Sequence, residues 1–302
     1  MRFLDIKTDF AFKKVFGAAD SKPRLISFLN ALVYDDSDVK IADLTIVDPY
    51  NIPLLKGMKD SFVDVKAILS DGTKVIIEMQ VLSCEGFEKR VLYNAAKNYS
   101  TQLLKGERYD LLNPIIALTI VDFVMFDETD QYITKFKLLE KDKFIRYNDD
   151  LELVFIELPK FEKELDTLSG VKEEWVWFVK NAGSLEYVPE TFSQDVKGAF
   201  DVANQANMTQ EELDIQFKKR DYIALQKGSL ALAQKQGLKQ GIQEGLKQGI
   251  EQGLKQGLEQ GMEHGSRKKS VEIALNLLDV LDCETVARKT GLSVEEVKAL
   301  RN

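Results

Sequence analysis

Two acidic residues, Asp64 and Glu78, have a type and a spacing that could support metal-assisted chemistry. They lie in residues 61–69 and 74–81, two segments in which apolar and polar side chains alternate, with Asp71-Gly72 between them. Alternation with a period of two predicts β-strands, and an Asp-Gly pair between such strands predicts a hairpin. The register of this hairpin decides whether the two carboxylates can act on one ligand.

A three-residue loop, residues 70–72, would place Asp64 opposite Glu78, whereas a two-residue turn would place it opposite Met79. The three-residue loop needs a left-handed residue at its third position, and Gly72 stands there. Only this register also puts both apolar sets on one face, because a slip of one residue turns every side chain to the other face. The apolar sets are Val63, Val65, Ala67 and Leu69, and Val75, Ile77, Met79 and Val81. We therefore expect Asp64 and Glu78 to be directly opposed.

Directly opposed carboxylates repel each other unless a cation lies between them. Their Cβ atoms would be about 4.5–5.5 Å apart, and oxygen ligands at that separation suit Mg²⁺ or Mn²⁺, which take further ligands from water and substrate phosphate. The same face would carry Lys66, Lys74 and Gln80. Such a pattern is also typical of the solvent-exposed face of a half-buried sheet, so the spacing alone leaves both interpretations open.

The composition of the chain excludes several kinds of site. One histidine and two cysteines support neither a histidine-based mechanism nor a tetrahedral zinc site. The hydrophobic fraction of 44% is that of a globular protein. The net charge of −8 argues against a protein that coats nucleic acid but allows a local basic surface. Without a signal-peptide pattern or a long apolar run, we expect a cytoplasmic protein with no membrane contact.

Helices and strands around the hairpin complete a mixed plan. Apolar residues at helical spacing predict a helix that begins at Thr8 or Asp9 and ends at Gly17. Two further helices are predicted at residues 24–33 and 87–105, and strands at residues 42–48, 114–121 and 152–158. The order helix, helix, strand, hairpin, helix, strand, strand indicates an α/β or α+β fold, with a mixed central sheet flanked by helices.

Three strings in this region resemble a known family. The segment from Asp64 to Gln80, D-(x13)-E-x-Q across a hairpin, resembles the E-x-Q form of the PD-(D/E)XK nuclease motif. The strings TDFAFKKVFG, IEMQ and KRVLYNAAKNYSTQLLKGERYDLLNPIIALTI are similar to the Rpn-type recombination-promoting nucleases, also described as PD-(D/E)XK nuclease family transposases. The resemblance covers about residues 3–160 and implies a restriction-endonuclease-like fold.

The resemblance also implies roles for individual residues. Asp64 and Glu78 would be catalytic metal ligands. Gln80 would be a catalytic residue at the position where the type motif has a lysine, which leaves the cationic role in catalysis to Lys66 or Lys74. Asp9 would be an additional metal ligand. Phosphate contacts are expected from four polar side chains on the first helix and on the helix after the hairpin: Lys13, Arg90, Tyr99 and Gln102. For these four residues and Asp9, a helix cap, a surface ion pair or an aromatic residue at the edge of the core is the alternative.

The second half of the chain contains a repeat with glycine at every fourth position, from Gly237 to Gly265. Leu, Ile or Met follows each of the first seven glycines. On a helix, the row of glycines and the row of apolar residues would each rotate around the axis by about 40° per repeat. This rotation favours a right-handed supercoil with a partner helix. Close packing along the glycines would suggest a homo-oligomer, whereas the alternative is a flexible linker.

The pattern predicts four regions: a nuclease-like domain at residues 1–160, a helical extension at 161–236, the repeat at 237–265, and a tail at 266–302. In the tail, Val271–Val280 is predicted to be a helix. Gly291, followed by Ser293 and Glu296 as a capping box, predicts a small helix-turn-helix-like unit. Its seven basic and six acidic side chains do not favour a helix that reads DNA.

The resemblance implies a DNA endonuclease that uses Mg²⁺ or Mn²⁺ to hydrolyse phosphodiester bonds and that promotes recombination or accompanies mobile elements. Two alternatives remain. One is a catalytically degenerate nucleic-acid-binding protein, which Gln80 and the acidic net charge would fit. The other is a scaffold that associates through its repeat. Metal-dependent cleavage distinguishes the first hypothesis from the others.

Overall fold

The computed structural model describes residues 1–51 and 61–301 of the chain, which forms two compact units, Met1–Gly228 and Ser229–Asn302. The strands are β1 (Leu44–Val47), β2 (Tyr50–Asn51), β3 (Ser61–Phe62), β4 (Val65–Leu69), β5 (Lys74–Gln80), β6 (Ile115–Val121), β7 (Ile133–Lys137) and β8 (Leu151–Glu157). The helices that cover them are α1 (Asp9–Phe16), α2 (Lys22–Leu32), α3 (Phe87–Ser100), α4 (Gly170–Asn181) and α5 (Gln194–Ala203).

Six of these strands form one mixed sheet in the order β1-β4-β5-β6-β8-β7. β5, β6 and β8 are parallel, whereas β1, β4 and β7 pair with antiparallel neighbours. The predicted mixed sheet is therefore confirmed. The edge strand β7 was missed, because its side chains are exposed or only partly buried and the segment lacks a clear alternation. β2 and β3 form a separate two-stranded sheet.

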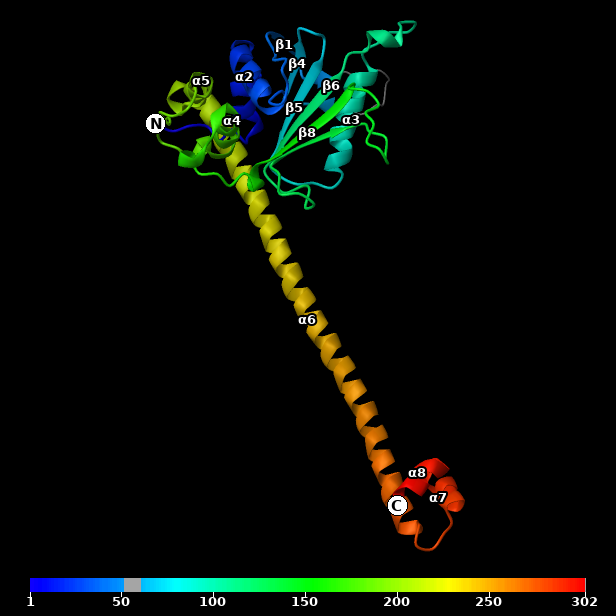
Figure 1. The fold of residues 1–302 in the computed structure, drawn as a ribbon. Helices are drawn as coiled ribbons and strands as arrows, with labels where there is room; N and C mark the ends of the chain where they lie inside the picture. Colours follow the sequence, from blue (N-terminus) through cyan, green and yellow to red (C-terminus); the bar gives the residue numbers. More distant parts are fainter. Residues whose placement is uncertain (52–60, 302) are drawn as a thin grey trace. The chain divides into compact units, whose positions relative to one another are not determined.

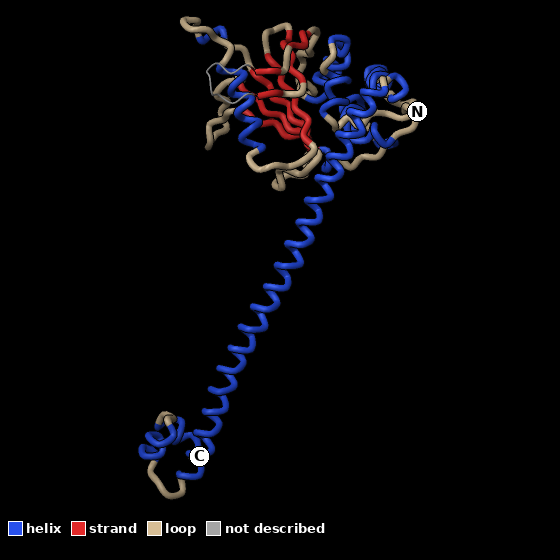
Figure 2. Tube along the Cα trace, turned by 180° about the vertical axis from the view of Figure 1, so that it is seen from behind, coloured by secondary structure: helices blue, strands red, loops and turns tan. Residues whose placement is uncertain are grey.

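Helices cover both faces of the large sheet. α2, α4 and α5 lie on one side and α3 lies on the other (Figure 1), so the strands run between two helical layers (Figure 2). The helices beyond residue 160 belong to the same core as the first helices, since Trp175 of α4 contacts the rings of Phe16 and Phe28. On the α3 side, Ala95 packs with Ile76 and Ala117. The face that carries Glu78 is therefore an inner layer of the fold and not an exposed outer face.

The hairpin between β4 and β5 has the predicted register. Val65 pairs with Ile77, Ile68 pairs with Lys74, and the Leu69 N–H donates to the Thr73 carbonyl at 2.8 Å. Gly72 adopts a φ of +89°, the left-handed conformation that the three-residue loop requires. The loop and the register predicted from the alternation are both confirmed.

The continuous strand expected at residues 61–69 was wrong. Asp64 and Val65 both lie opposite Ile77, since the Asp64 N–H donates to the Ile77 carbonyl at 2.9 Å while Val65 pairs with the same residue. This extra residue forms a bulge, so the expected position of Asp64 directly opposite Glu78 was wrong, and the residues before Asp64 turn to the other face of the sheet. As a consequence, Val63 packs with Ile76 on the α3 side and not with Val65 on the opposite side.

Glu157, at the end of β8, is a fully buried acid that sequence patterns did not single out. It accepts hydrogen bonds from the Met125 and Phe126 N–H groups at 2.6 and 3.2 Å, and from Lys160 Nζ at 2.8 Å. A carboxylate with these donors fixes the loop after β6 to the end of β8.

Replacement of Glu157 by alanine is expected to lower the free energy of unfolding by about 3 kcal/mol, because it leaves two N–H groups without their acceptor and removes the carboxylate that pairs with the largely buried Lys160. Chemical denaturation monitored by tryptophan fluorescence would measure this loss. Glu162→Ala removes an exposed acid nearby and should leave the denaturation midpoint unchanged. Equal midpoints for the two variants would contradict the assigned role of Glu157.

In the second unit, the glycine repeat is helical as part of α6 (Gln210–Leu277), and the predicted helix at Val271–Val280 is the end of this same helix. No atom would lie within 4 Å of an added Cβ at any glycine from Gly237 to Gly265. α7 (Cys283–Thr290) and α8 (Val294–Leu300) follow, and Ser293 and Glu296 form the predicted capping box. Within the described residues, no helix is long and apolar enough to cross a membrane.

A candidate metal site between the hairpin and two helices

Asp64 lies immediately before β4, and its carboxylate is held at both oxygens. Oδ2 accepts a hydrogen bond from the Met79 N–H at 2.8 Å, and Oδ1 lies 3.2 Å from Lys13 Nζ. In a regular ladder, Met79 would pair with the backbone of Val63, but the bulge frees its N–H for the Asp64 side chain. The side chain is 12% exposed. The irregular backbone at this point therefore aims the carboxylate.

Glu78 lies on β5 and faces α3. Its Oε1 atom is 2.7 Å from Arg90 Nη2, and its carboxylate also forms a hydrogen bond with the Asn94 side chain. Arg90 and Asn94 are one helical turn apart, so both side chains point from α3 toward the same strand position. The Glu78 side chain is 15% exposed. Asn94 was not singled out from the sequence, although its spacing from Arg90 could have indicated it.

Burial raises the pKa of both carboxyl groups. For Asp64, the Met79 N–H and Lys13 oppose this increase in pKa, and the charge of Asp9 adds to it. For Glu78, Arg90 opposes the increase in pKa, and the charge of Asp64 adds to it. A cation shared by these two desolvated acids would favour the ionised form of both. Oxygen donors of this kind suit Mg²⁺ or Mn²⁺.

Gln80 has hydrogen bonds at both ends of its amide. Its Oε1 atom accepts from Arg90 Nη2 at 2.6 Å, and its Nε2 atom donates to the Leu82 carbonyl at 2.7 Å. The guanidinium carbon of Arg90 lies 4.9 Å from the centre of the Phe87 ring. The guanidinium of Arg90 therefore contacts the side chains of both Glu78 and Gln80.

The first helix contributes Lys13 to this site. Thr8 caps α1 by accepting from the Ala11 N–H at 3.3 Å, and this start places Lys13 over Asp64. Asp9 lies in the first turn and forms an ion pair with Lys219 of α6 at 3.1 Å, so its charge acts on Asp64 without direct contact. Within the described residues, no three His, Cys, Asp or Glu side chains are arranged to hold a metal ion. A metal at this site would rest on Asp64 and Glu78.

The two lysines expected to supply the missing cation lie further along the strands. Lys66 is level with Ile76, and Lys74 is four residues before Glu78, or about 13 Å along β5. Burial lowers the pKa of both ammonium groups, and the charge of Lys74 adds to this for Lys66. In the described part of the chain, the cations in contact with the two acids are Lys13 and Arg90.

Tyr99 and Gln102 are not brought to the acids. The Tyr99 hydroxyl donates to Asp150 at 2.6 Å, which raises the pKa of the phenol to about 12. Gln102 donates to the Asn113 carbonyl at 2.8 Å and accepts from its N–H. Tyr99 lies nine residues beyond Arg90 on α3, about 13 Å along the helix. These contacts stabilise the connection into β6, which gives both residues a structural reason to be present.

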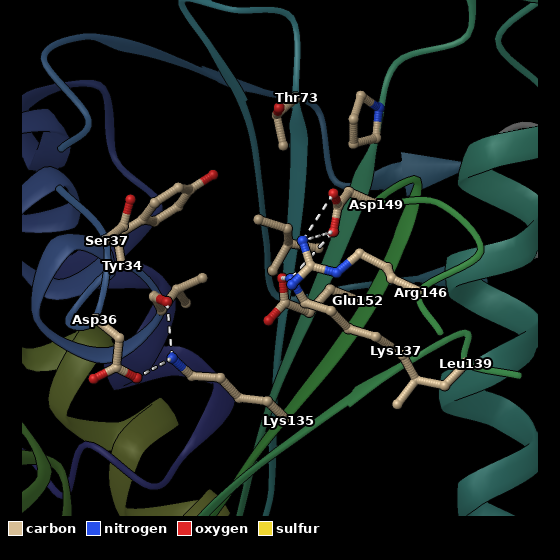
Figure 3. Close-up of a pocket in the computed structure, with 13 residues that line it drawn as sticks. Tyr34, Asp36, Ser37, Thr73, Lys135, Lys137, Leu139, Arg146, Asp149 and Glu152 are labelled. Atoms are coloured by element: carbon tan, nitrogen blue, oxygen red, sulfur yellow. Dashed lines mark hydrogen bonds and ion pairs between the residues drawn. The ribbon is translucent and has the colours of Figure 1, made fainter. Parts of the chain in front are cut away.

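A polar cleft of about 790 Å³ lies elsewhere on the sheet, between the starts of β5 and β8 and the strand β7. Its cations are already paired: Lys135 with Asp36, and Lys137 and Arg146 with Asp149 (Figure 3). Glu152 forms a further ion pair with Lys137 at 3.3 Å. This balanced charge offers no free centre for chemistry, so the two desolvated acids remain the better candidate site.

Comparison with protein families agrees with this geometry. The family model described as PD-(D/E)XK nuclease family transposase matches residues 6–231, which extends the similarity beyond the sheet into the first part of α6. Comparison with curated proteins and with solved structures found no significant match. The mixed sheet with helices on both faces fits the restriction-endonuclease-like fold. The chain belongs to the PD-(D/E)XK nuclease family transposases.

Proposed function

We propose that the protein is a divalent-metal-dependent DNA endonuclease that hydrolyses phosphodiester bonds and acts in recombination or in the movement of mobile elements. The membership of a nuclease family supports the reaction class. The observation that carries the proposal is the pair of desolvated carboxylates, Asp64 and Glu78, each with a raised pKa and each in contact with a basic side chain.

In this proposal, Asp64 and Glu78 hold Mg²⁺ or Mn²⁺. When bound, the metal would polarise a phosphoryl oxygen and lower the pKa of a water molecule. The Met79 N–H keeps Asp64 in one orientation, and Asn94 does the same for Glu78. Lys13 and Arg90 flank the two acids and would contact the oxygens of the scissile phosphate. The protein thus contributes orientation and positive charge beside two largely buried carboxylates.

We also propose that the repeat in α6 mediates self-association. Its apolar side chains, from Leu238 to Met262, have exposed fractions between 54% and 70%. Scattered exposed apolar residues are common, but seven at a regular spacing on one helix form a repeated surface. A second copy of the chain carries the same spacing and could pack along it.

Supercoiled plasmid DNA should be nicked or linearised by the purified protein when Mg²⁺ or Mn²⁺ is present, and should stay intact when the metal is chelated. Restoring an excess of Mg²⁺ after chelation should restore cleavage, because two carboxylates with few other ligands bind the ion reversibly. Gel electrophoresis across a metal series measures this. Cleavage that persists with full activity in chelator would contradict the metal-dependent mechanism, and intact DNA under every metal would favour a binding protein that keeps the fold.

A further inference from the structure

The E-x-Q segment places a neutral amide, Gln80, where the type motif has a cation. We propose that Arg90 of α3 is the catalytic cation in contact with the scissile phosphate, and that Gln80 is a positioning residue for Arg90 that does not itself touch the substrate. This inference rests on the proposed nuclease function. It assigns different roles to the two residues from those expected from sequence, where Gln80 was catalytic and Arg90 was one of several phosphate contacts.

The hydrogen bonds of Gln80 fix the orientation of its amide. The Nε2 group uses one of its two N–H donors on the Leu82 carbonyl at 2.7 Å. That bond fixes the orientation of the amide, so Oε1 is presented to Arg90 Nη2 at 2.6 Å. An amide oxygen repels a phosphate oxygen, whereas it attracts a guanidinium. The orientation of Gln80 therefore suits an arginine partner.

One terminal nitrogen of the Arg90 guanidinium has partners within the protein, and the other has none among the described residues. Nη2 contacts both Glu78 and Gln80, and the guanidinium lies against the Phe87 ring. Across the described part of the chain, the other terminal nitrogen, Nη1, forms no hydrogen bond, and the side chain is 39% exposed. A guanidinium has donors for two partners in fixed directions, so contact with Glu78 and Gln80 leaves donors for a phosphate oxygen.

The backbone fixes the distance between this guanidinium and the acids. α3 begins at Phe87, after Gly86 in the left-handed conformation, and Arg90 lies in its first turn. Val91 and Ala95 are buried against the sheet and anchor the same turn and the next one. The guanidinium consequently reaches β5 beside Glu78, near the place from which a lysine at position 80 would extend. The charge is supplied by the helix and not by the strand.

Three variants test the exchange of roles. Arg90→Met should lower kcat by about 100-fold, the usual effect of removing one donor to the transition state. Gln80→Lys, which returns the motif to its lysine form, should remain active. The double variant Gln80→Lys/Arg90→Met should recover at least tenfold of the activity lost in Arg90→Met. A purely structural role for Arg90 would give no such recovery, so absence of rescue, or wild-type activity of Arg90→Met, would overturn the proposal.

The positioning role of Gln80 has a separate signature. Gln80→Leu removes both hydrogen bonds but keeps Arg90, so kcat should fall by about tenfold while KM stays the same. An unchanged kcat in this variant would show that Arg90 does not depend on Gln80. Thermal unfolding of each variant verifies that it is folded, and Arg90→Gln replaces Arg90→Met if the methionine variant does not fold.

A binding measurement separates this inference from the proposed function. With a short DNA duplex in chelator, Arg90→Met should reduce the slope of log affinity against log salt by about 1, because one phosphate contact is lost. Gln80→Leu should leave the slope unchanged, and the double variant should restore it. If the wild-type protein does not cleave DNA under any metal, the nuclease proposal fails. In that case the salt dependence of DNA binding still tests whether Arg90 contacts a phosphate. An unchanged slope in Arg90→Met would overturn that contact.

Discussion

Replacement of Asp64 by asparagine is expected to abolish metal-dependent DNA cleavage and, at the same time, to raise the midpoint of thermal unfolding at pH 7. Asparagine retains an oxygen that can accept from the Met79 N–H but loses the charge that would bind the metal. Loss of groups that merely support metal ligands costs about 10–100-fold in affinity, so loss of a ligand charge should exceed about 100-fold. Catalysis and stability should therefore change in opposite directions.

The rise in stability follows from the direction of the pKa shift. Burial raises the pKa of Asp64 in the folded protein, so above the ordinary aspartate pKa the folded state carries an ionised group at a cost that the unfolded chain does not have. Asparagine removes this cost at neutral pH. When the pH falls below about 3.9, the carboxyl is protonated in both states and the advantage of the variant disappears. The ion pair with partly exposed Lys13 is already included in this balance, because the pKa of Asp64 is raised with Lys13 in place.

Thermal denaturation with and without Mg²⁺ completes the test. The metal binds only the folded state, so it should raise the midpoint of the wild-type protein with increasing concentration and leave Asp64→Asn unchanged. Asp38→Asn, at an exposed position, serves as the matched control and should behave like the wild type in cleavage, stability and metal response. A Mg²⁺ response of equal size in Asp64→Asn would place the metal elsewhere, and wild-type cleavage by this variant would remove Asp64 from the site.

Local patterns predicted the parts of the site that lie within one hairpin. Gly72 and the two alternating segments specify the loop and the register in which β4 pairs with β5, because these depend on backbone conformation and period. The bulge at Asp64 was beyond such patterns, because the alternation in the sequence continues through Val63 while the backbone inserts an extra residue at Asp64. The Asp64 side chain then takes the hydrogen bond of the Met79 N–H. Val63 is apolar and can pack on either face of the sheet, so the sequence alone did not determine which face it occupies.

Contacts between distant elements were less predictable. Arg90 and Gln80 are ten residues apart and lie on a helix and a strand, and nothing in either segment states which atom of the amide faces the guanidinium. Lys66 shares the polar set of the hairpin with Glu78, yet its position along the strand keeps it level with Ile76. Tyr99 has the helical spacing of a site residue, but the fold brings Asp150 to its hydroxyl. Side-chain partners of this kind depend on tertiary packing, which the sequence pattern does not encode locally.

Alanine at all eight glycines of the repeat, Gly237 to Gly265, is expected to make α6 more stable as a single helix and to weaken self-association of the full chain. Each interior glycine costs about 1 kcal/mol relative to alanine, so the eight changes favour the helix by about 8 kcal/mol. Every added Cβ would meet open space in the single chain. Between two helices, however, the same methyl groups would keep the backbones apart and reduce their contact.

The two effects are measured together on the full-length protein, by far-ultraviolet circular dichroism and sedimentation velocity over a range of concentrations. In the wild type, helix content and mass should rise together, because packing of a second copy offsets the cost of the glycines. In the alanine variant, helix content should be higher at low concentration and should not depend on concentration, while the mass stays nearer that of one chain. A control variant with alanine at Gln240, Gln248 and Gln256 keeps every glycine. In this variant, helix content and mass should rise together with concentration, as in the wild type. If the wild-type repeat is instead a linker, its helix content will stay low and constant as the concentration rises, and the mass will not respond to the glycine changes.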